Sequence, residues 1–597
     1  MTVAIRVTLF GGIIPRVANR GLPDNAAQYA MNAKLTSGEL RSWNGLRALG
    51  TLPISNSKTT FHYRHNGLDR YLAFPVVTHV VKAPLINETL GRLYWTNADG
   101  AFVNTTTRIE ANQPPFKLGV PAPTGTFTVV AAGGNSDTVE TRVYLATVVT
   151  DYGEESAPGQ PVTVSGKADG TWTVNGLNTL TFDAVNYPNV KKLRLYRTLD
   201  SDTGVDYRQV NEWDIGSRPA SYVDNVTNVD VADNTVLQSL GWNRPVDGLQ
   251  GLIAVAGGFL AGFKGRTVYL SVPYYPHAWP EDTVFAVEDN IIGLATFGNT
   301  IVVLTEGRGA LLIGPDPAAM SLLKMDGVQP CLSEKSIVVT VAGVMYASND
   351  GLVLVDGTAN TGQIVSRSWV TKDEWLARFD PKNQQSAVYQ DRYLSFYSSQ
   401  LGLCVGFDDP ITGYTELQLD GVNSVDTDTL TGQTLITVGN TVYEWDGDPT
   451  TRFNYTWRSK PFLQVKPTNF AALQVRGSFI GAGVDPPDIP PVPATGHPYN
   501  TRPINGGMGG STYGASMNGP ALWMAQGVAP TPEGGPTVTV KLFADGVQRW
   551  AGNIGNEKPV RLPSGYKGVR TEFEISGSSD IYSVTFVDTM KGLENLP

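Results

Sequence analysis

Short runs of β-branched and aromatic residues alternate with two- or three-residue turns along residues 252–355. The pattern occurs three times. It predicts strands at 253–256, 259–263 and 267–272, at 294–296, 300–305 and 310–313, and at 337–341, 344–348 and 352–355. Turns such as Gly-Gly, Gly-Asn and Asn-Asp-Gly between such runs are typical of antiparallel hairpins. A repeat of roughly 40 to 45 residues with three or four strands per unit is typical of propeller blades. We therefore predict an all-β chain organised around a β-propeller.

Weaker copies of this pattern lie on both sides of the central repeat. One spans 60–103, and two more lie at 386–407 and 417–445, with a single helical turn predicted before them at 372–377. Together with the central copies they give a propeller of about six or seven blades, one of them discontinuous in sequence. We assign the first portion of the propeller to 51–120 and its main blades to 241–450.

The segment 121–240 has a different pattern. Pro-Ala-Pro-Thr-Gly opens it as a linker, and several short strands follow over roughly 110 residues, as in a two-sheet sandwich. The phrases YLATVVTDYGEESAP and VKKLRLYRTLDSDT resemble a strand and turn of a fibronectin type III domain. Because blade-like repeats flank this segment, we predict a fibronectin type III-like sandwich inserted into the propeller.

The N-terminal segment, 1–50, is predicted to contain a strand, a short helix and a docking segment. Residues 3–14 are apolar but are interrupted by Arg6 and by a Gly-Gly pair, which indicates a strand rather than a signal peptide. Asp24 and Asn25 are favourable N-cap residues before the Ala-rich run 26–31, which favours a helix. The polar stretch 32–43 is either a docking segment or a loop packed on the body of the chain.

The C-terminal part, 451–597, is predicted to form a small β-domain with strands that include 538–543, 570–575 and 581–586. Within it, the segment 484–536 is nearly uncharged and dense in Pro and Gly, a composition that cannot fill a core by itself. Its Met and aromatic residues suggest that it orders against a neighbouring protein; a surface loop is the alternative interpretation.

Composition limits the compartment and the partners. The 597 residues carry a net charge of −10, with 41% hydrophobic and 17% charged residues, so a core is available and the surface is weakly polar. The two cysteines, Cys331 and Cys404, cannot form a disulfide framework and are expected to be buried thiols of a chain that folded in a reducing cytoplasm. No apolar run approaches the roughly 20 residues of a membrane span. The negative charge argues against binding nucleic acid through phosphate neutralisation.

Catalytic and metal-binding patterns are weak in this sequence. His62 and His65 are three residues apart on a predicted strand, so their side chains point to opposite faces and cannot share a metal there. His277 lies among aromatic residues and prolines, as in a packed connection. The Gly-rich stretches 262–267 and 305–314 are flanked by strands and do not open a helix, which argues against a phosphate cradle. We therefore predict no catalytic, cofactor-binding or metal-binding residues.

Propellers also include glycosidases, which use a pair of carboxylates. The candidates for such a pair are Glu306, Asp316, Asp326 and Asp350. Asp316 and Asp350, however, lie in Pro-Asp-Pro and Asn-Asp-Gly turns, where Asp side chains commonly bond to the local backbone. Nothing marks two of the four as facing each other, so we expect the chain not to be an enzyme.

Several phrases resemble the nozzle, or tail-tube stabilisation, proteins of short-tailed bacteriophages. They are LFGGIIPRVANRGLPDNAAQYAMNAKLTSGELRSW near the start, AGGFLAGFKGRTVYLSVPYYPHAWP, ATFGNTIVVLTEGRGALLIGPDPAAMSLLKMDGVQPCLSEKSIV and VMYASNDGLVLV in the repeat region, and VRLPSGYKGVRTEFEISG near the end. The resemblance spans most of the chain and is made of short phrases rather than catalytic signatures.

The resemblance implies a structural virion protein of the tail, synthesised in the cytoplasm of the host bacterium. Six copies would form a ring below the head–tail adaptor, and viral DNA would pass through the shared lumen without sequence-specific binding. The other expected partners are a tail fibre or spike and a tail tip or needle. An acidic lumen wall would repel phosphate during ejection. The alternative is a carbohydrate-binding or glycan-cleaving propeller protein used in host attachment.

Overall fold

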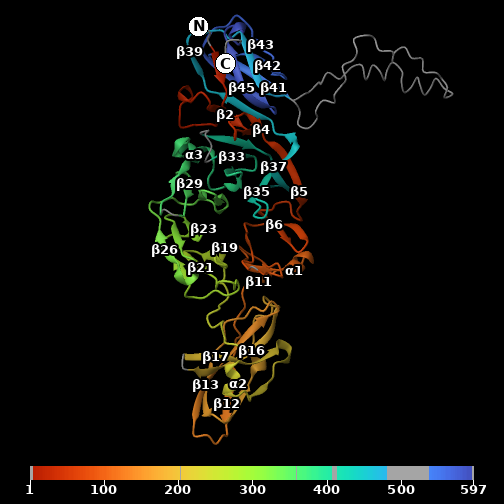
Figure 1. Ribbon diagram of the computed structural model, residues 1–597, viewed down its shortest axis with the longest axis vertical. Coiled ribbons are helices and arrows are strands. Elements are labelled where there is room, and N and C mark those ends of the chain that lie inside the picture. Colours follow the sequence, from red (N-terminus) through yellow and green to blue (C-terminus); the bar gives the residue numbers. More distant parts are fainter. Residues whose placement is uncertain are drawn as a thin grey trace, which may run out of the picture.

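The computed structural model describes residues 4–85, 87–201, 204–357, 360–406, 413–479 and 537–593; the Gly/Pro-rich segment 484–536 lies outside them. The described chain is all-β, as predicted. Its α-helices are the short α1 (Thr106–Glu110), α2 (Asn228–Ala232) and α3 (Lys372–Arg378), and α3 confirms the predicted turn at 372–377. Figure 1 shows three parts along the long axis: a sandwich at one end, a ring of sheets in the middle, and a module holding both chain ends.

Seven groups of antiparallel strands make up the ring; we call them sheets and number them in chain order, and the sixth continues into a ten-stranded sheet that includes strands of the end module. Sheet 1 is β6 (Thr59–His65) and β7 (Leu68–Phe74); sheet 2 is β8 (His79–Lys82), β9 (Leu93–Asn97), β10 (Gly100–Asn104) and β11 (Phe116–Lys117); sheet 3 is β19 (Gln250–Val255), β20 (Phe259–Lys264), β21 (Thr267–Leu270) and β22 (Val284–Ala286); sheet 4 is β23 (Ile291–Phe297), β24 (Thr300–Thr305), β25 (Ala310–Ile313) and β26 (Ser321–Lys324). Sheet 5 is β27 (Val338–Thr340), β28 (Gly343–Ser348), β29 (Gly351–Val355) and β30 (Gln363–Ile364); sheet 6 is β31 (Gln385–Tyr389), β32 (Arg392–Phe396), β33 (Leu401–Gly406) and β34 (Tyr414–Gln418); sheet 7 is β35 (Val422–Thr427), β36 (Thr434–Val438), β37 (Thr441–Arg452) and β5 (Asn44–Thr51). The hairpins predicted between 252 and 355 are confirmed, but the sequence pattern missed the short fourth strands.

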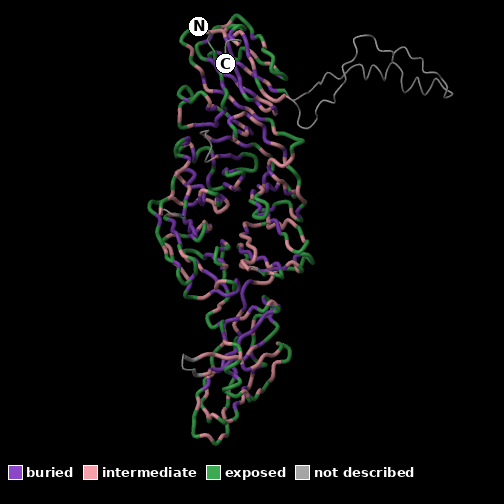
Figure 2. Tube along the Cα trace, in the orientation of Figure 1, coloured by how far each residue is buried: buried purple, intermediate pink, exposed green. Residues whose placement is uncertain are grey.

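The sheets follow one another around a closed circuit. The first strand of each sheet from sheet 2 to sheet 1 lies beside the first strand of the next: β19 beside β8 and β23, β27 beside β23 and β31, and β35 beside β31 and β6. Sheets 1 and 2 meet through an apolar cluster that includes Tyr63 and Trp95. Apolar side chains fill the spaces between the sheets, and the cluster around Phe259 and Ile301 between sheets 3 and 4 is one example. Buried residues lie along the strands, and exposed residues gather at the turns and outer edges (Figure 2). Burial of apolar surface between neighbours therefore holds the ring together.

Strand β5 closes the circuit. It comes early in the chain, before sheet 1, yet it pairs with β37, the third strand of sheet 7, with Thr441 opposite Thr51 and Val442 opposite Gly50. The two ends of the ring segment are thus joined by backbone hydrogen bonds, so the ring cannot open without breaking a sheet.

The predicted insertion at 121–240 folds as two packed sheets between β11 and β19. One sheet has the order β12 (Thr128–Ala132), β15 (Thr171–Asn175), β18 (Ser221–Asp224); the other has the order β14 (Val162–Lys167), β13 (Val139–Thr150), β16 (Val190–Ser201), β17 (Gly204–Asp214). Trp172 and Leu195 belong to one apolar cluster between the sheets and are almost fully buried. Inside this core the guanidinium of Arg197 lies 3.1 Å from the carboxylate of Asp224, and both side chains are buried.

An ion-pair cluster joins the sandwich to the ring. Arg92, which precedes β9 of the ring, contacts Glu154 of the sandwich at 3.0 Å and Glu88 at 2.7 Å. The backbone N–H of Ala157 also donates to the carbonyl of Trp242, at the far end of the inserted segment. Burial raises the pKa of Glu154 to about 7, although Arg92 lowers it. The joint therefore contains a carboxyl group that changes its charge near neutral pH.

We expect the stability of the protein to fall between about pH 4.5 and pH 7 because of Glu154. In this range the folded chain keeps a proton that the unfolded chain, with an ordinary glutamate pKa near 4.3, has released. The contribution is fully present below the lower pKa and is lost as pH rises through about 7, a change on the order of 3 kcal/mol. Glu154→Gln should flatten this slope in urea unfolding measured at pH 5 and pH 8. Glu110→Gln, at an exposed position, should leave it unchanged.

The remaining strands form the end module with both chain termini. They are β38 (Tyr455–Ser459), β39 (Phe462–Thr468), β40 (Ala472–Ser478), β41 (Val538–Ala544), β42 (Val547–Ile554), β43 (Val560–Arg561), β44 (Gly568–Gly577) and β45 (Asp580–Val587), joined by β1 (Ala4–Val7) and β2 (Ala27–Met31) from the N-terminal segment. β1 pairs with β45, so the first and last strands of the described chain lie side by side (Figure 1).

The helix predicted at 26–31 is wrong, because these residues form strand β2. β2 pairs antiparallel with β38 and touches β34 of sheet 6 in a parallel bridge at Met31. Ala27 and Ala30 are fully buried. Tertiary pairing thus overrides the helix propensity of the Ala-rich run. β2 also links the end module to the ring.

The polar stretch 32–43 packs on the body of its own chain, the second of the two interpretations of that stretch. It forms the small hairpin β3 (Ala33–Lys34) and β4 (Arg41–Ser42). Leu40 exchanges backbone hydrogen bonds with Ile581 of the end module, and Trp43 is buried among side chains of sheets 6 and 7. This stretch therefore fixes the end module to the ring.

Candidate functional site: a polar network inside the ring

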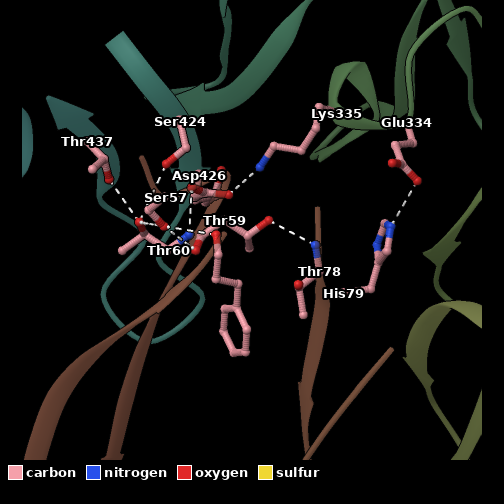
Figure 3. A network of polar contacts seen from close by, with 12 residues as sticks. Ser57, Thr59, Thr60, Thr78, His79, Glu334, Lys335, Ser424, Asp426 and Thr437 are labelled. Carbon is pink, nitrogen blue, oxygen red and sulfur yellow. Dashed lines mark hydrogen bonds and ion pairs between the residues drawn. The ribbon is translucent and has the colours of Figure 1, made fainter. Parts of the chain in front are cut away.

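A network of polar side chains joins strands from distant parts of the ring, and we call it the central polar network. Figure 3 shows its members, which come from sheets 1 and 2, from the approach to sheet 5, and from sheet 7. They are Ser57, Thr59, Thr60, Thr78, His79, Glu334, Lys335, Ser424, Asp426 and Thr437. These residues lie on or next to the first strands of their sheets, which border one another around the circuit, so the network is on the inner side of the ring.

Two ion pairs cross the ring. Nζ of Lys335 lies 2.5 Å from Oδ1 of Asp426, and Nε2 of His79 lies 3.3 Å from Oε2 of Glu334. Lys335 and Glu334 belong to the 3₁₀ turn η5 (Glu334–Ser336) before sheet 5, whereas Asp426 is on β35 of sheet 7 and His79 on β8 of sheet 2. The His79–Glu334 pair therefore bypasses sheets 3 and 4, and the Lys335–Asp426 pair bypasses sheet 6.

A hydroxyl cluster anchors the carboxylate of Asp426 to sheet 1. The backbone N–H of Thr60 donates to Oδ2 of Asp426 at 3.1 Å, and the Thr60 hydroxyl lies 2.9 Å from that of Thr437. Asp426 thus binds a lysine with one oxygen and a backbone N–H with the other. The two contacts satisfy a carboxylate that is largely buried, which removes most of the cost of burying it.

The two ion pairs connect sheets that are not neighbours in the circuit. We therefore expect them to resist shearing of the ring. Their partly buried charges are screened less by salt than surface charges.

Lys335→Met should lower the unfolding free energy of the ring by about 1–3 kcal/mol, because it leaves the buried carboxylate of Asp426 with fewer partners. Lys324→Met is the matched control, since Lys324 and its partner Glu288 are both more than half exposed and such surface pairs contribute about 0–1 kcal/mol. Calorimetric scans of both variants test this. Equal effects of the two changes would contradict a stabilising role for the crossing pair.

A buried histidine bound by two carboxylates lies beside the central polar network. Nδ1 of His62 is 2.7 Å from Oδ2 of Asp428, and its Nε2 is 2.7 Å from Oδ1 of Asp69. The ring also stacks on Tyr71 with centroids 4.6 Å apart. The Thr431 hydroxyl donates to Asp428 at 2.6 Å. Because carboxylates already bind both ring nitrogens, His62 serves as a bridge between strands rather than as a free base.

The other histidines considered in the sequence analysis lie apart from this cluster. His65, on the same strand as His62, packs near Gly91, and no hydrogen bond within the described chain reaches its Nε2. His277 is buried and meets the rings of Trp242 and Tyr275 edge-on, and burial lowers its pKa to about 3. Each of these side chains is part of a local packing arrangement.

The four carboxylates considered as a glycosidase pair have separate local contacts. Oδ1 of Asp316 accepts from the Ala318 N–H at 2.9 Å, the turn contact expected from the sequence. Glu306 accepts from Asn290, Asp326 from Asn360, and Asp350 pairs with Lys372 at 2.6 Å. In the part of the chain that the structure describes, these contacts do not bring any two of the four together.

Two further features concern metals and thiols. Cys331 and Cys404 are buried thiols, as predicted, and burial raises the pKa of the Cys331 thiol to about 12. Over the described ranges, no group of three or more His, Cys, Asp or Glu side chains is arranged to hold a metal ion. Among the same residues no helix is long and apolar enough to cross a membrane.

Sequence reasoning did not find the central polar network. Its members are separated by more than 250 residues between His79 and Glu334 and by 91 between Lys335 and Asp426. The sequence signal was limited to the hydroxyl residues Ser57, Thr59 and Thr60, at or just before the start of the copy predicted at 60–103, and such residues are as common on exposed strand faces. Only the circuit of sheets brings them together.

The sequence and structure of this chain have little similarity to those of known proteins. No family model matches the sequence, and no curated protein matches it. Among solved structures, the chain is similar to PorZ of Porphyromonas gingivalis, an essential bacterial surface component of the type-IX secretion system. The sequence identity is 9% and the TM-score is 0.26, over 71% of this chain and 44% of that chain. The chain thus spans less than half of the length of PorZ.

Proposed function

We propose that the chain is a structural virion protein that forms a ring-shaped tail nozzle below the head–tail adaptor of a short-tailed bacteriophage. In this proposal the ring of seven sheets is a β-propeller with one two-stranded blade, closed by β5. The phrase-like resemblance supports the family. The observation that carries the proposal is a ring closed by β5 and braced by ion pairs between sheets that are not neighbours. Such a ring suits a rigid subunit of a large assembly.

We further propose that the inserted sandwich is a fibronectin type III-like domain. In the order β14–β13–β16–β17, two hairpins pair through β13 and β16 to make a four-stranded sheet, which faces a three-stranded one, an arrangement common in such sandwiches. The sandwich lies at the end of the molecule away from the chain termini (Figure 1), so it would project from the assembly.

The DNA channel of such a nozzle must lie between copies of the chain. The ion pairs of Lys335 and His79 link non-neighbouring sheets within each copy, so in this proposal the lumen is formed by the assembly rather than by a single ring. A surplus of acidic residues facing that lumen would repel the phosphates of passing DNA. The adaptor ring, a fibre or spike, and a tip or needle remain the proposed partners.

Negative-stain imaging of the purified chain with its adaptor tests this proposal. We expect six-fold rings with an open centre formed between subunits. A trimeric stalk, or a monomer that releases sugars from host glycans, would instead support the carbohydrate-directed alternative and overturn the nozzle. Glu110→Gln, at an exposed position, serves as a control that should still assemble.

A further inference from the structure

Sheet 1 is the exception in the ring because it has only two strands. Every other sheet has β-strands in the third and fourth positions, whereas sheet 1 ends at β7. Within the described residues, no strand pairs with the outer edge of β7. Its backbone N–H and C=O groups on that side therefore lack the ladder partners that the equivalent second strands of the other sheets have.

The place of the missing strands is a slot of about 570 Å³. Its floor is β7, including Tyr71, Leu72 and Phe74. One wall comes from the end of β5 and the residues after it, with Thr51 and Leu52, and belongs to sheet 7. The opposite wall comes from sheet 2 and the α1 region and is lined by Trp95, Asn104, Ile109, Asn112, Gln113 and Pro115. The slot thus lies between sheets 2 and 7, the two neighbours of sheet 1. The outer strands of sheet 1 would occupy this position if the sheet were complete.

The chemistry of the slot favours an uncharged occupant. Arg70 is the one charged residue that lines it, and this arginine already donates to the carbonyl of Ile109 at 2.9 Å and to Oδ1 of Asn112 at 2.8 Å. The other lining residues are apolar or neutral. The apolar side chains on the two faces of β7 pack partly against sheets 2 and 7 and remain half-exposed where the outer strands are missing.

We propose that the outer edge of β7 binds an extended strand of a separate polypeptide, uncharged and with apolar side chains at alternate positions. Strand addition supplies main-chain hydrogen bonds along an open edge, and alternate side chains fill the pockets beside it. A folded second copy does not suit the slot, because the strands in its described part are already held in their own sheets. The slot between two sheets accommodates a strand or a hairpin but not the edge of a whole sheet.

The test uses the full chain and a fluorescent, end-capped nine-residue peptide of alternating threonine and valine. We expect saturable binding, with slower amide hydrogen exchange confined to residues 68–74. The same peptide N-methylated at every second residue lacks the N–H donors along one edge of its extended strand. It should bind at least ten-fold more weakly. Thr51→Trp places a bulky ring at an exposed wall position and should weaken binding by a similar factor without disturbing the fold.

The controls separate strand addition from other contacts. Val130→Trp, at an exposed position on the sandwich, should not change peptide binding. Equal binding of the N-methylated peptide, unchanged exchange in 68–74, or no effect of Thr51→Trp would overturn the proposal. A photo-cross-linker at Thr51 that links the free protein to its own residues 480–536, or to a second copy, would also overturn it, because the slot would then have an occupant within this chain.

Discussion

Replacing Trp457 with alanine is expected to lower the unfolding free energy of the end module by about 3–5 kcal/mol, the usual cost of truncating a buried Trp. Trp457 is on β38 and is fully buried. Its ring meets Phe10 edge-on at 5.1 Å and Phe573 at 5.7 Å, and its Nε1–H donates to the carbonyl of Gly11 at 3.0 Å. One side chain thus joins the N-terminal segment to the C-terminal strands, so its loss creates a cavity and leaves a buried carbonyl unpaired.

Calorimetry with transitions assigned to the separate parts of the chain checks this prediction. Trp457→Phe keeps most of the ring contact with Phe10 and Phe573 but removes the N–H donor, so it should cost only about 1–2 kcal/mol. The transition of the sandwich should not move in either variant. If Trp457→Ala lowers the unfolding free energy by less than about 1 kcal/mol, the contacts of Trp457 with the N-terminal segment contribute little to the stability of the end module.

His62→Ala is expected to destabilise the ring by about 3–5 kcal/mol, because it removes one partner of a buried ionisable pair. The side chain of Asp428 is only 1% exposed, and it would keep the hydroxyl of Thr431 and the N–H of Leu430 as donors but lose the imidazole. Burial raises the pKa of Asp428, but those donors and His62 lower it by more, so this carboxyl group is charged at neutral pH. An uncompensated buried charge is costly.

His65→Ala is the matched control for this change, since His65 is on the same strand and makes no hydrogen bond through Nε2 within the described chain. It should cost less than about 1 kcal/mol, as substitutions away from buried networks usually do. Urea unfolding at pH 7 followed by tryptophan fluorescence compares the two variants. Similar losses of unfolding free energy in the two variants would mean that the pairing of His62 with Asp428 does not stabilise the ring.

The sequence by itself determined the strands with strong local signals. Alternating apolar runs separated by Gly and Asn turns placed β19 to β21, β23 to β25 and β27 to β29 close to their observed bounds. The single helical turn predicted at 372–377 is α3, and the structure shows that Thr371 and Glu374 form a capping box at its start. These elements could be predicted because neighbouring residues set both the alternation and the turn or cap.

Short strands and strands made by pairing were decided only by the tertiary structure. The fourth strands β22, β26 and β30 have two to four residues, too few for a period-2 pattern to show. The Ala-rich run of β2 has a helical composition locally, and only its position between β38 and β34 makes it a strand. Pairing partners hundreds of residues away supply the hydrogen bonds that local propensity cannot supply.

The same division applies to the candidate sites. The sequence determined that the chain is strand-rich, weakly charged and acidic, and that its turn aspartates have local contacts such as that of Asp316 with Ala318. Only the closed circuit of sheets decided that Lys335 meets Asp426, that His62 lies between two carboxylates, and that β7 borders an open slot. Contacts between side chains so far apart in sequence depend on how the sheets are arranged, which no local pattern specifies.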